Sequence, residues 1–575
     1  MIRIGNASGF YGDRSTAWRE MLDGGELDVL TGDYLAELTM LILGRDRLRD
    51  PSLGYAKTFL RQLEGTLGTA LERGVQIVTN AGGVNPAGLA AAIGSLADRL
   101  GLTVRIGYVE GDAVPRPDAL TANAYLGAFG IAACLEAGAD VVVTGRVTDA
   151  SLVVGPGIAR FGWRHDDLDA LAGATVAGHL IECGAQVTGG NFSFFTELPD
   201  GGRRPGFPVA ELHPDGSSVI TKHPGTGGAV TVETVTAQLL YEIGGPDYLG
   251  PDVVTRLDTV ALRQDGPDRV RVSGTRGAPP PDTLKVGVNN LGGFRNSMTF
   301  VLCGLDVPAK AALVRDQIEA AIGPEGLEFR LARTDQVDAG DTETASALLH
   351  VHLKDGDKAR AGRAFSGAAV ELALASYPGC TLTTLPGDAT PYGVFTSDTV
   401  PQDAVTHVAV LPSGERVPIP PPPLTCEQGS PAEQKSPVGG PSYHPTRRGA
   451  LGELVGARSG DKGGDANLGI WARTEAAYVW LRGWLTVERL GELLPETVGL
   501  TVERYELPNL RAVNFVIRGL LGQGVAASTR FDPQAKALGE LLRARIVDLP
   551  AELLPTGRTT GSATPGVPGG AGVPS

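Results

Sequence analysis

Cysteine is scarce in this sequence, and long apolar runs are missing. The five cysteines, an odd number spread over 575 residues, include no Cys-x-x-Cys pair, which argues against a disulfide framework and for a reducing compartment. No uncharged apolar stretch approaches the ~20 residues that a membrane-spanning helix needs. The N-terminus lacks a basic region followed by an apolar segment, so we expect no secretory signal and a cytoplasmic protein.

An excess of positive charge is also missing. The formal net charge is -15, the pI is about 5.1, and no run of Lys and Arg occurs. Such a chain repels nucleic-acid phosphates and anionic lipid surfaces, so we expect neither nucleic acid nor a membrane as partner. A phosphate-bearing thioester is not excluded, because a local group of backbone N–H donors can bind phosphate on an acidic protein.

Apolar material and glycine are plentiful. Hydrophobic residues make up 42% and charged residues 20%, an ordinary balance for a globular protein of more than one core. Short β-branched runs that end at Gly or Asn alternate with segments of helical spacing, which predicts an α/β fold with a mostly parallel sheet. In such sheets ligands bind where loops leave the carboxyl ends of the strands. The runs are 2–4, 76–79, 104–108 and 140–144.

The chain divides at a proline-rich stretch. Residues 1–410 form the α/β region, with a mixed α+β part from about 198 onward and a further boundary near 200 left open. Residues 411–447, rich in Pro and Gly, are typical of a linker. Residues 448–550 suggest four strands and two helices, an α+β domain of ferredoxin-like type. Residues 551–575 have the composition of a disordered tail.

Two polar loops follow predicted strands of the sheet. In the run TNAGG, Asn80, Gly82 and Gly83 offer an amide and unobstructed backbone for substrate binding, although a helix N-cap explains the same residues. In the run TGRVTDA, Arg146 can hold a carboxylate or phosphate and Asp149 can act as acid or base. The alternative for the second loop is an internal pair of Arg146 with Asp149.

The run GHLIECG places three reactive side chains on one predicted helix face. His179, Glu182 and Cys183 stand at i, i+3 and i+4, which allows acid–base or metal chemistry. Two metal ligands without a third do not define a site, so the metal stays open. Cys183 can be a nucleophile, but a buried free cysteine is more often inert.

Three further segments carry polar groups near glycines. Gly189, Gly190 and Asn191 form another open turn, and Lys222 adds a cation in a glycine-rich context, so we count them with the substrate-binding residues. In the run ARSGDKGGDAN, we expect a loop between two strands of the C-terminal domain. This loop could donate side chains to a site shared between the domains, or be a simple turn; the side chains are Asp461, Lys462, Asp465 and Asn467.

Several of these runs occur in a characteristic order. GFYGDR, TNAGG, GRVTDASL, GHLIECGAQVTGGNF and the pair GFPVAEL and ITKHPGTGG resemble the acyclic terpene utilisation AtuA family over residues 2 to about 410. Residues 451–549 are similar to the ferredoxin-fold domain of some members. The resemblance implies bacterial breakdown of citronellol- and geraniol-type terpenoids and related branched acids through CoA thioesters.

The resemblance and the motifs together predict an enzyme of lyase or hydratase type that acts on an acyl-CoA or its carboxylic acid. Asp149, His179 and Glu182 are the candidate bases, and the amides, cations and glycine turns named above are the candidate donors. The alternatives are hydrolysis by Cys183 or by metal-activated water, and a non-catalytic binding or scaffold subunit. Cofactors are left open, with CoA as a substrate moiety, a divalent metal as an option, and a homo-oligomer expected.

Overall fold

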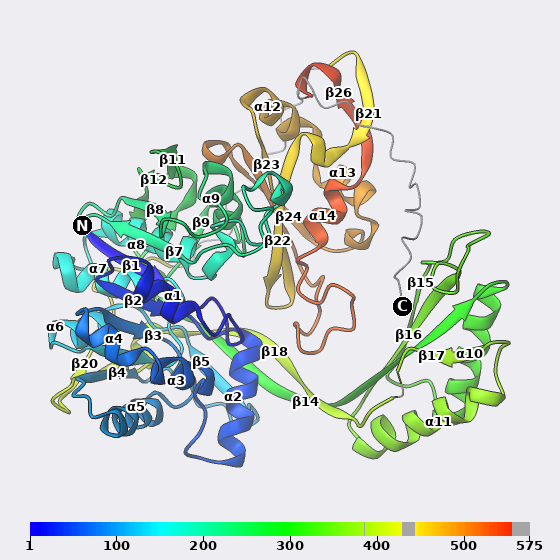
Figure 1. The fold of residues 1–575 in the computed structure, drawn as a ribbon, viewed down its shortest axis with the longest axis horizontal. Coiled ribbons are helices and arrows are strands. Elements are labelled where there is room, and N and C mark those ends of the chain that lie inside the picture. Colours follow the sequence, from blue (N-terminus) through cyan, green and yellow to red (C-terminus); the bar gives the residue numbers. More distant parts are fainter. Residues whose placement is uncertain (385, 428–442, 555–575) are drawn as a thin grey trace, which may run out of the picture.

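The computed structural model describes residues 1–384, 386–427 and 443–554. It has three parts (Figure 1): an N-terminal body, an outlying module of residues 293–391, and a C-terminal domain of residues 443–554. The central part of the expected linker, 428–442, and the expected tail from 555 to 575 lie outside the described residues.

An eleven-stranded sheet organises the N-terminal body. Five central strands, β1, β2, β3, β6 and β4, pair in parallel, and antiparallel strands extend the sheet on both sides. The α/β class is therefore confirmed, with the parallel pairing confined to the centre. The strands after residue 200 belong to the same sheet as those before it, because β7 pairs directly with β1. In spatial order the strands are β11 (Ala261–Gln264), β12 (Val270–Ser273), β8 (Ser218–Lys222), β7 (Pro208–Leu212), β1 (Ile2–Asn6), β2 (Val29–Gly32), β3 (Gln76–Thr79), β6 (Val141–Thr144), β4 (Ile106–Glu110), β19 (Val408–Val410) and β20 (Arg416–Pro418).

Helices cover both faces of the central strands. Val142 of β6 belongs to one apolar core, and Val141 and Val143 belong to another, as alternation along a doubly covered strand requires. In the described part of the chain, no helix is long and apolar enough to cross a membrane. The helices of the body are α1 (Ala17–Gly24), α2 (Glu37–Arg49), α3 (Lys57–Glu64), α4 (Leu67–Glu72), α5 (Pro86–Leu100), α6 (Phe129–Glu136), α7 (Ser151–Phe161), α8 (Leu168–Ile181) and α9 (Val232–Leu239).

The expected mixed α+β part contributes to two places. Three short strands, β9 (Asp247–Leu249), β10 (Val254–Arg256) and β13 (Arg276–Ala278), form a small sheet of the body. The outlying module is carried on two long paired strands, β14 (Thr283–Cys303) and β18 (Thr390–Pro401). Its own core lies between strands and helices and includes Phe300 and Phe365. The other elements are β5 (Thr121–Ala124), which joins β14 to the body, and β15 (Leu327–Ala332), β16 (Ser346–Asp355), β17 (Thr381–Leu382), α10 (Val307–Ile322) and α11 (Phe365–Glu371).

The C-terminal domain is a four-stranded antiparallel sheet in the order β22-β23-β25-β24. The chain runs from β23 through α12 and α13 to β24, yet β25 lies between β23 and β24, the split β-α-β arrangement of ferredoxin-like folds. The ferredoxin-like prediction is confirmed. The elements are β21 (Thr446–Ala450), β22 (Val455–Lys462), β23 (Asp465–Ala472), α12 (Glu475–Trp484), α13 (Val487–Leu493), β24 (Val502–Leu507), β25 (Ala512–Ile517), α14 (Leu538–Arg543) and β26 (Ile546–Pro550).

The loop predicted at the start of this domain is instead a hairpin of two paired strands. Asp461 and Lys462 end β22, Asp465 and Asn467 lie in β23, and the two strands form a tight hairpin in which Lys462 faces Asp465. The turn consists of two glycines, the first of them Gly463 at φ +68, and such turns favour glycine because they require positive φ. The connection is therefore the simple turn that was the alternative interpretation, and the four polar side chains lie on the paired strands.

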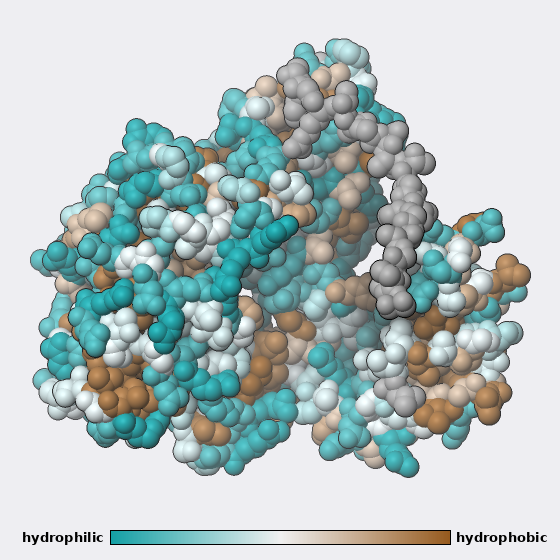
Figure 2. Space-filling view, viewed as in Figure 1, coloured by the Kyte–Doolittle hydropathy of each residue, from teal (hydrophilic) through white to brown (hydrophobic). Residues whose placement is uncertain are grey.

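The C-terminal domain packs tightly on the N-terminal body. Trp471 of β23 belongs to the apolar core of the body, with ring centroids 6.3 Å from both Phe192 and Phe194. Arg473 makes ion pairs with Glu233 at 2.7 Å and with Glu197 at 3.0 Å. Figure 2 shows the surface indented where the body, the C-terminal domain and the outlying module meet.

Candidate functional site

Buried polar side chains gather at the carboxyl edge of the parallel strands. Asp33 follows β2, Asn80 follows β3, and Arg146 and Asp149 follow β6. The side chain of Asn80 is fully buried; its Oδ1 accepts from the backbone N–H of Tyr34 at 2.8 Å, and its Nδ2 donates to Asp33 Oδ1 at 2.6 Å. Asn80 therefore positions Asp33 at the edge that topology reserves for ligands.

Arg146 and Asp149 pair with each other in the loop after β6. Nη1 of Arg146 lies 3.0 Å from Oδ1 of Asp149 and donates to the carbonyl of Leu35 at 3.0 Å, and the guanidinium stacks 4.1 Å from the ring centroid of Tyr125. The carboxylate of Asp112 accepts from the backbone N–H of Arg146 at 2.9 Å and fixes the loop. The Arg146 side chain is 5% exposed and that of Asp149 28%, so Asp149 is the member that a substrate can reach.

His179 and Glu182 form a second pair at the end of α8. Nδ1 of His179 lies 3.0 Å from Oε1 of Glu182, while Nε2 and Oε2 have no hydrogen-bond partner among the described residues. Burial lowers the pKa of His179 to about 4. Burial and the charge of Asp149 raise the pKa of Glu182 well above its usual value. At neutral pH the imidazole is therefore uncharged, and burial favours the protonated form of the Glu182 carboxyl, which suits proton transfer.

Cys183 lies beyond the helix on which it was expected. The helix ends at Ile181, and Cys183 precedes a short 3₁₀ turn, so it does not share the helical face of His179. Burial and the nearby Glu182 raise the pKa of its thiol well above the usual value, which disfavours the thiolate that a nucleophile requires. Within the described residues, no group of three or more His, Cys, Asp or Glu side chains could hold a metal ion.

The C-terminal hairpin brings Lys462 to the same place. Its Nζ donates to the carbonyl of Glu242 at 2.8 Å and lies 5.9 Å from the ring centroid of Tyr248, which is itself 5.3 Å from that of His179. Asn467 accepts from the backbone N–H of Glu242 at 2.8 Å. Glu242 adopts φ +56, a left-handed conformation that is strained for a non-glycine residue. The hairpin thus holds both backbone polar groups of Glu242.

Two important side chains were not found from the sequence. Lys285, in β14, places its Nζ 4.7 Å from the ring centroid of Tyr125 and 6.0 Å from that of Phe395. Glu37, at the start of α2, has a pKa raised by burial, and the charge of Lys285 opposes this shift. A single lysine between apolar strand residues was the available signal for Lys285; no motif marked Glu37.

These groups are linked by contacts and by electrostatic interactions and form one set, which we call the polar cluster. Its members come from the body and from the C-terminal hairpin. They are Asp33, Glu37, Tyr125, Arg146, Asp149, His179, Glu182, Cys183, Glu242, Tyr248, Lys285, Asp461 and Lys462.

The glycine turns do not open into the polar cluster. A Cβ at Gly82 would lie 2.5 Å from the carbonyl oxygen of Thr144, and one at Gly83 would lie 2.8 Å from that of Gly54, so these glycines permit close packing of the chain. The N–H groups of Gly189 and Gly190 donate to nearby backbone carbonyls at 3.0 and 2.9 Å. Their donors are already used within the turn.

Three other expected site residues also lie outside the polar cluster. Lys222 pairs with Asp268 at 3.0 Å, and Asp465 pairs with Arg518 at 2.7 Å. Asn191 has φ +56 and an exposed side chain in the turn after Gly190. An ion pair or a turn conformation therefore accounts for each of these residues.

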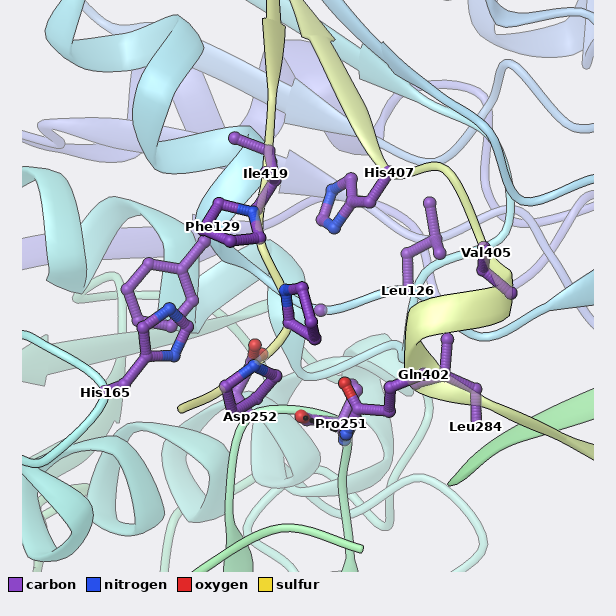
Figure 3. A pocket seen from close by; sticks show the side chains of 14 residues that line it. Leu126, Phe129, His165, Pro251, Asp252, Leu284, Gln402, Val405, His407 and Ile419 are labelled. Carbon is purple, nitrogen blue, oxygen red and sulfur yellow. Dashed lines mark hydrogen bonds between the residues drawn. The ribbon is translucent and has the colours of Figure 1, made fainter. Parts of the chain in front are cut away.

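A separate cavity lies beside the proline run (Figure 3). It has a volume of about 30 Å³, room for roughly one water molecule, and its lining includes His165 stacked on Phe129 at 3.8 Å. The described start of the expected linker packs here, because Pro420 to Pro422 form one wall. The cavity contains none of the expected site residues, so the polar cluster is the candidate site.

Comparisons with known proteins agree with this architecture. A family model described as acyclic terpene utilisation family protein AtuA matches residues 2–117 and 115–411. A second model, the AtuA ferredoxin-like domain, matches residues 450–548. No curated protein and no solved structure matches the chain.

Proposed function

Because the chain belongs to the acyclic terpene utilisation AtuA family, we propose that it acts in the breakdown of acyclic terpenoid or related branched acids. The substrate is a carboxylic acid or its CoA thioester, and the reaction is of lyase or hydratase type.

One observation carries the proposal: the polar cluster holds both an accessible carboxylate and a buried carboxyl group whose pKa burial raises. Asp149 is ion-paired and reachable, whereas Glu182 is buried against His179. Pairs of titratable groups held in opposite protonation states are the usual acid and base of an active site. Burial and, after it, the charge of Asp149 raise the pKa of Glu182, so the two groups interact electrostatically.

In a dehydration, the carboxylate of Asp149 takes the proton from the carbon next to the carbonyl. The bond from the neighbouring carbon to its hydroxyl group then breaks, and Glu182 gives its proton to the leaving hydroxyl, which departs as water. The product is the unsaturated acid or thioester, and the enzyme regains its starting state when the proton passes from Asp149 back to Glu182. In this proposal the ammonium group of Lys462 stabilises the negative charge that develops on the carbonyl oxygen.

The test is a screen of purified protein against branched 3-hydroxy acids and their CoA thioesters, followed by mass spectrometry. Asp149→Asn and Glu182→Gln should each abolish most turnover, and Asp316→Asn, an exposed aspartate of α10 without an ion pair, is the matched control. Full activity of both variants would overturn the acid–base assignment.

Two alternatives have distinct signatures in the same screen. Hydrolysis by Cys183 predicts a free acid released from a thioester and loss of activity in Cys183→Ala, and hydrolysis by metal-activated water predicts loss of activity with a chelator. A non-catalytic scaffold predicts ligand or partner binding without any turnover. The raised pKa of Cys183 argues against the first of these.

A further inference from the structure

The ammonium groups of Lys285 and Lys462 come from different domains and lie near the junction between them. Lys285 lies on β14 of the body and Lys462 at the tip of the C-terminal hairpin. Both border Phe395: the Nζ of Lys285 is 6.0 Å from its ring centroid, and a Cβ at Gly463, next to Lys462, would lie 3.4 Å from its ring. Phe395 thus lies beside Lys285 and beside the residue that follows Lys462, and the charge of Lys285 acts on Lys462 across the junction of the domains.

Neither ammonium group has a carboxylate partner in the part of the chain that the structure describes. Among the described residues, no carboxylate oxygen forms an ion pair within 4.0 Å of either Nζ, although Lys285 has an aromatic face beside it and Lys462 a carbonyl oxygen. Arg146, by contrast, is paired with Asp149. Lys285 is half-buried and Lys462 is solvent-exposed. Two neighbouring cations repel each other, and an anion between them would remove that cost.

The surrounding acids do not satisfy the lysines. Burial raises the pKa values of Asp33, Glu37 and Glu182, and it raises that of Asp461 to about 8, so burial disfavours a negative charge on these carboxyl groups. The charged and titratable groups that act on Lys462 or Lys285 are Glu37, Tyr125, Arg146, Asp149, Glu182 and Glu242.

We propose that Lys285 and Lys462 together hold an anionic oxygen group of the ligand, either the carboxylate of a branched acid or a phosphate of a CoA thioester. The ligand then bridges the body and the C-terminal domain, and the site is incomplete without the hairpin. The proposal rests on the proposed function in one respect: it takes the bound anionic group to be part of the substrate that the polar cluster converts.

The experiment is calorimetric titration of the full chain, with isovalerate in one arm and inorganic phosphate in the other. At least one anion should bind saturably, and the arm that binds identifies the source of the anionic group. Lys285→Met and Lys462→Met should each weaken that binding about tenfold or more. Lys358→Met, at an exposed lysine of the outlying module, is the matched control and should bind as the unaltered chain does.

Two further variants guard against a folding defect. Lys285→Arg and Lys462→Arg keep the charge and should restore most of the binding that the methionine variants lose. Absence of binding in both arms, or equal affinity of the methionine variants and the control, would overturn the proposal.

Turnover separates this proposal from the proposed function. If no acid or thioester is converted but anion binding depends on both lysines, the function fails and the anion site stands. If substrate is converted with an unchanged KM in both methionine variants, the anion site fails and the function stands.

Discussion

Gly469→Ala should loosen the contact between the C-terminal hairpin and the body. Gly469 lies in β23, and a Cβ there would be 2.7 Å from the Cβ of Leu240, whereas ordinary contact begins at 3.4 Å. The chain must shift by about 0.7 Å, and because the obstacle is a Cβ of the fully buried Leu240, no side-chain rotation can provide the space. Such overpacking costs about 1–3 kcal/mol.

Replacing glycine by alanine also stabilises by about 0.4–1 kcal/mol, because it restricts the unfolded chain. The midpoints of the two ranges give a net loss of roughly 1.3 kcal/mol in the free energy of unfolding. Urea unfolding followed by circular dichroism measures it. Gly491→Ala, in α13, is the matched control. Its Cβ would lie 3.5 Å from Val498, which is an ordinary contact distance, and alanine favours helices. Equal stability of Gly469→Ala and the unaltered chain would show that the interface relaxes around the added methyl group without a cost in free energy. That result would refute the reasoning.

Asp149→Asn should lower turnover by about a hundredfold or more while ligand affinity, measured by calorimetry, changes far less. Cys183→Ala should keep most of the activity, because the raised pKa of the thiol leaves little thiolate; loss of turnover in a folded variant contradicts this. Anion binding should weaken as pH rises through about 8, since the pKa of Lys462 is lowered to about 8 and the group loses its charge above that value, while Asp461 gains a negative charge in the same range. Lys462→Arg should extend binding to higher pH, and an identical pH profile in this variant would exclude Lys462 as the titrating group.

Local patterns predicted what local geometry decides. The strand ends at Thr79 and Thr144 carried Asn80, Arg146 and Asp149 to the ligand edge of the sheet, because parallel strands share one carboxyl edge. The spacing of His179 and Glu182 predicted their contact, although the helix ends just before Glu182.

Contacts that depend on domain docking could not be predicted. Lys285 and Glu37 belong to no recognisable motif. They join the polar cluster because a hairpin more than 150 residues further along the chain lies beside them. The glycine pairs show a second limit of the sequence. An unhindered backbone serves close packing as well as it serves a ligand, and composition cannot separate the two uses.

The long strand β14 limits how the chain can change in length during evolution. Successive residues of a strand face opposite sides, and here Lys285 stands between Leu284 and Val286, which belong to the apolar core. Deleting one residue before Lys285 would exchange these faces and place the ammonium group in the core. The pairing of β14 with β18 already shifts register between Leu291 and Gly293. Insertions should therefore be tolerated there, where the outlying module can lengthen without disturbing Lys285.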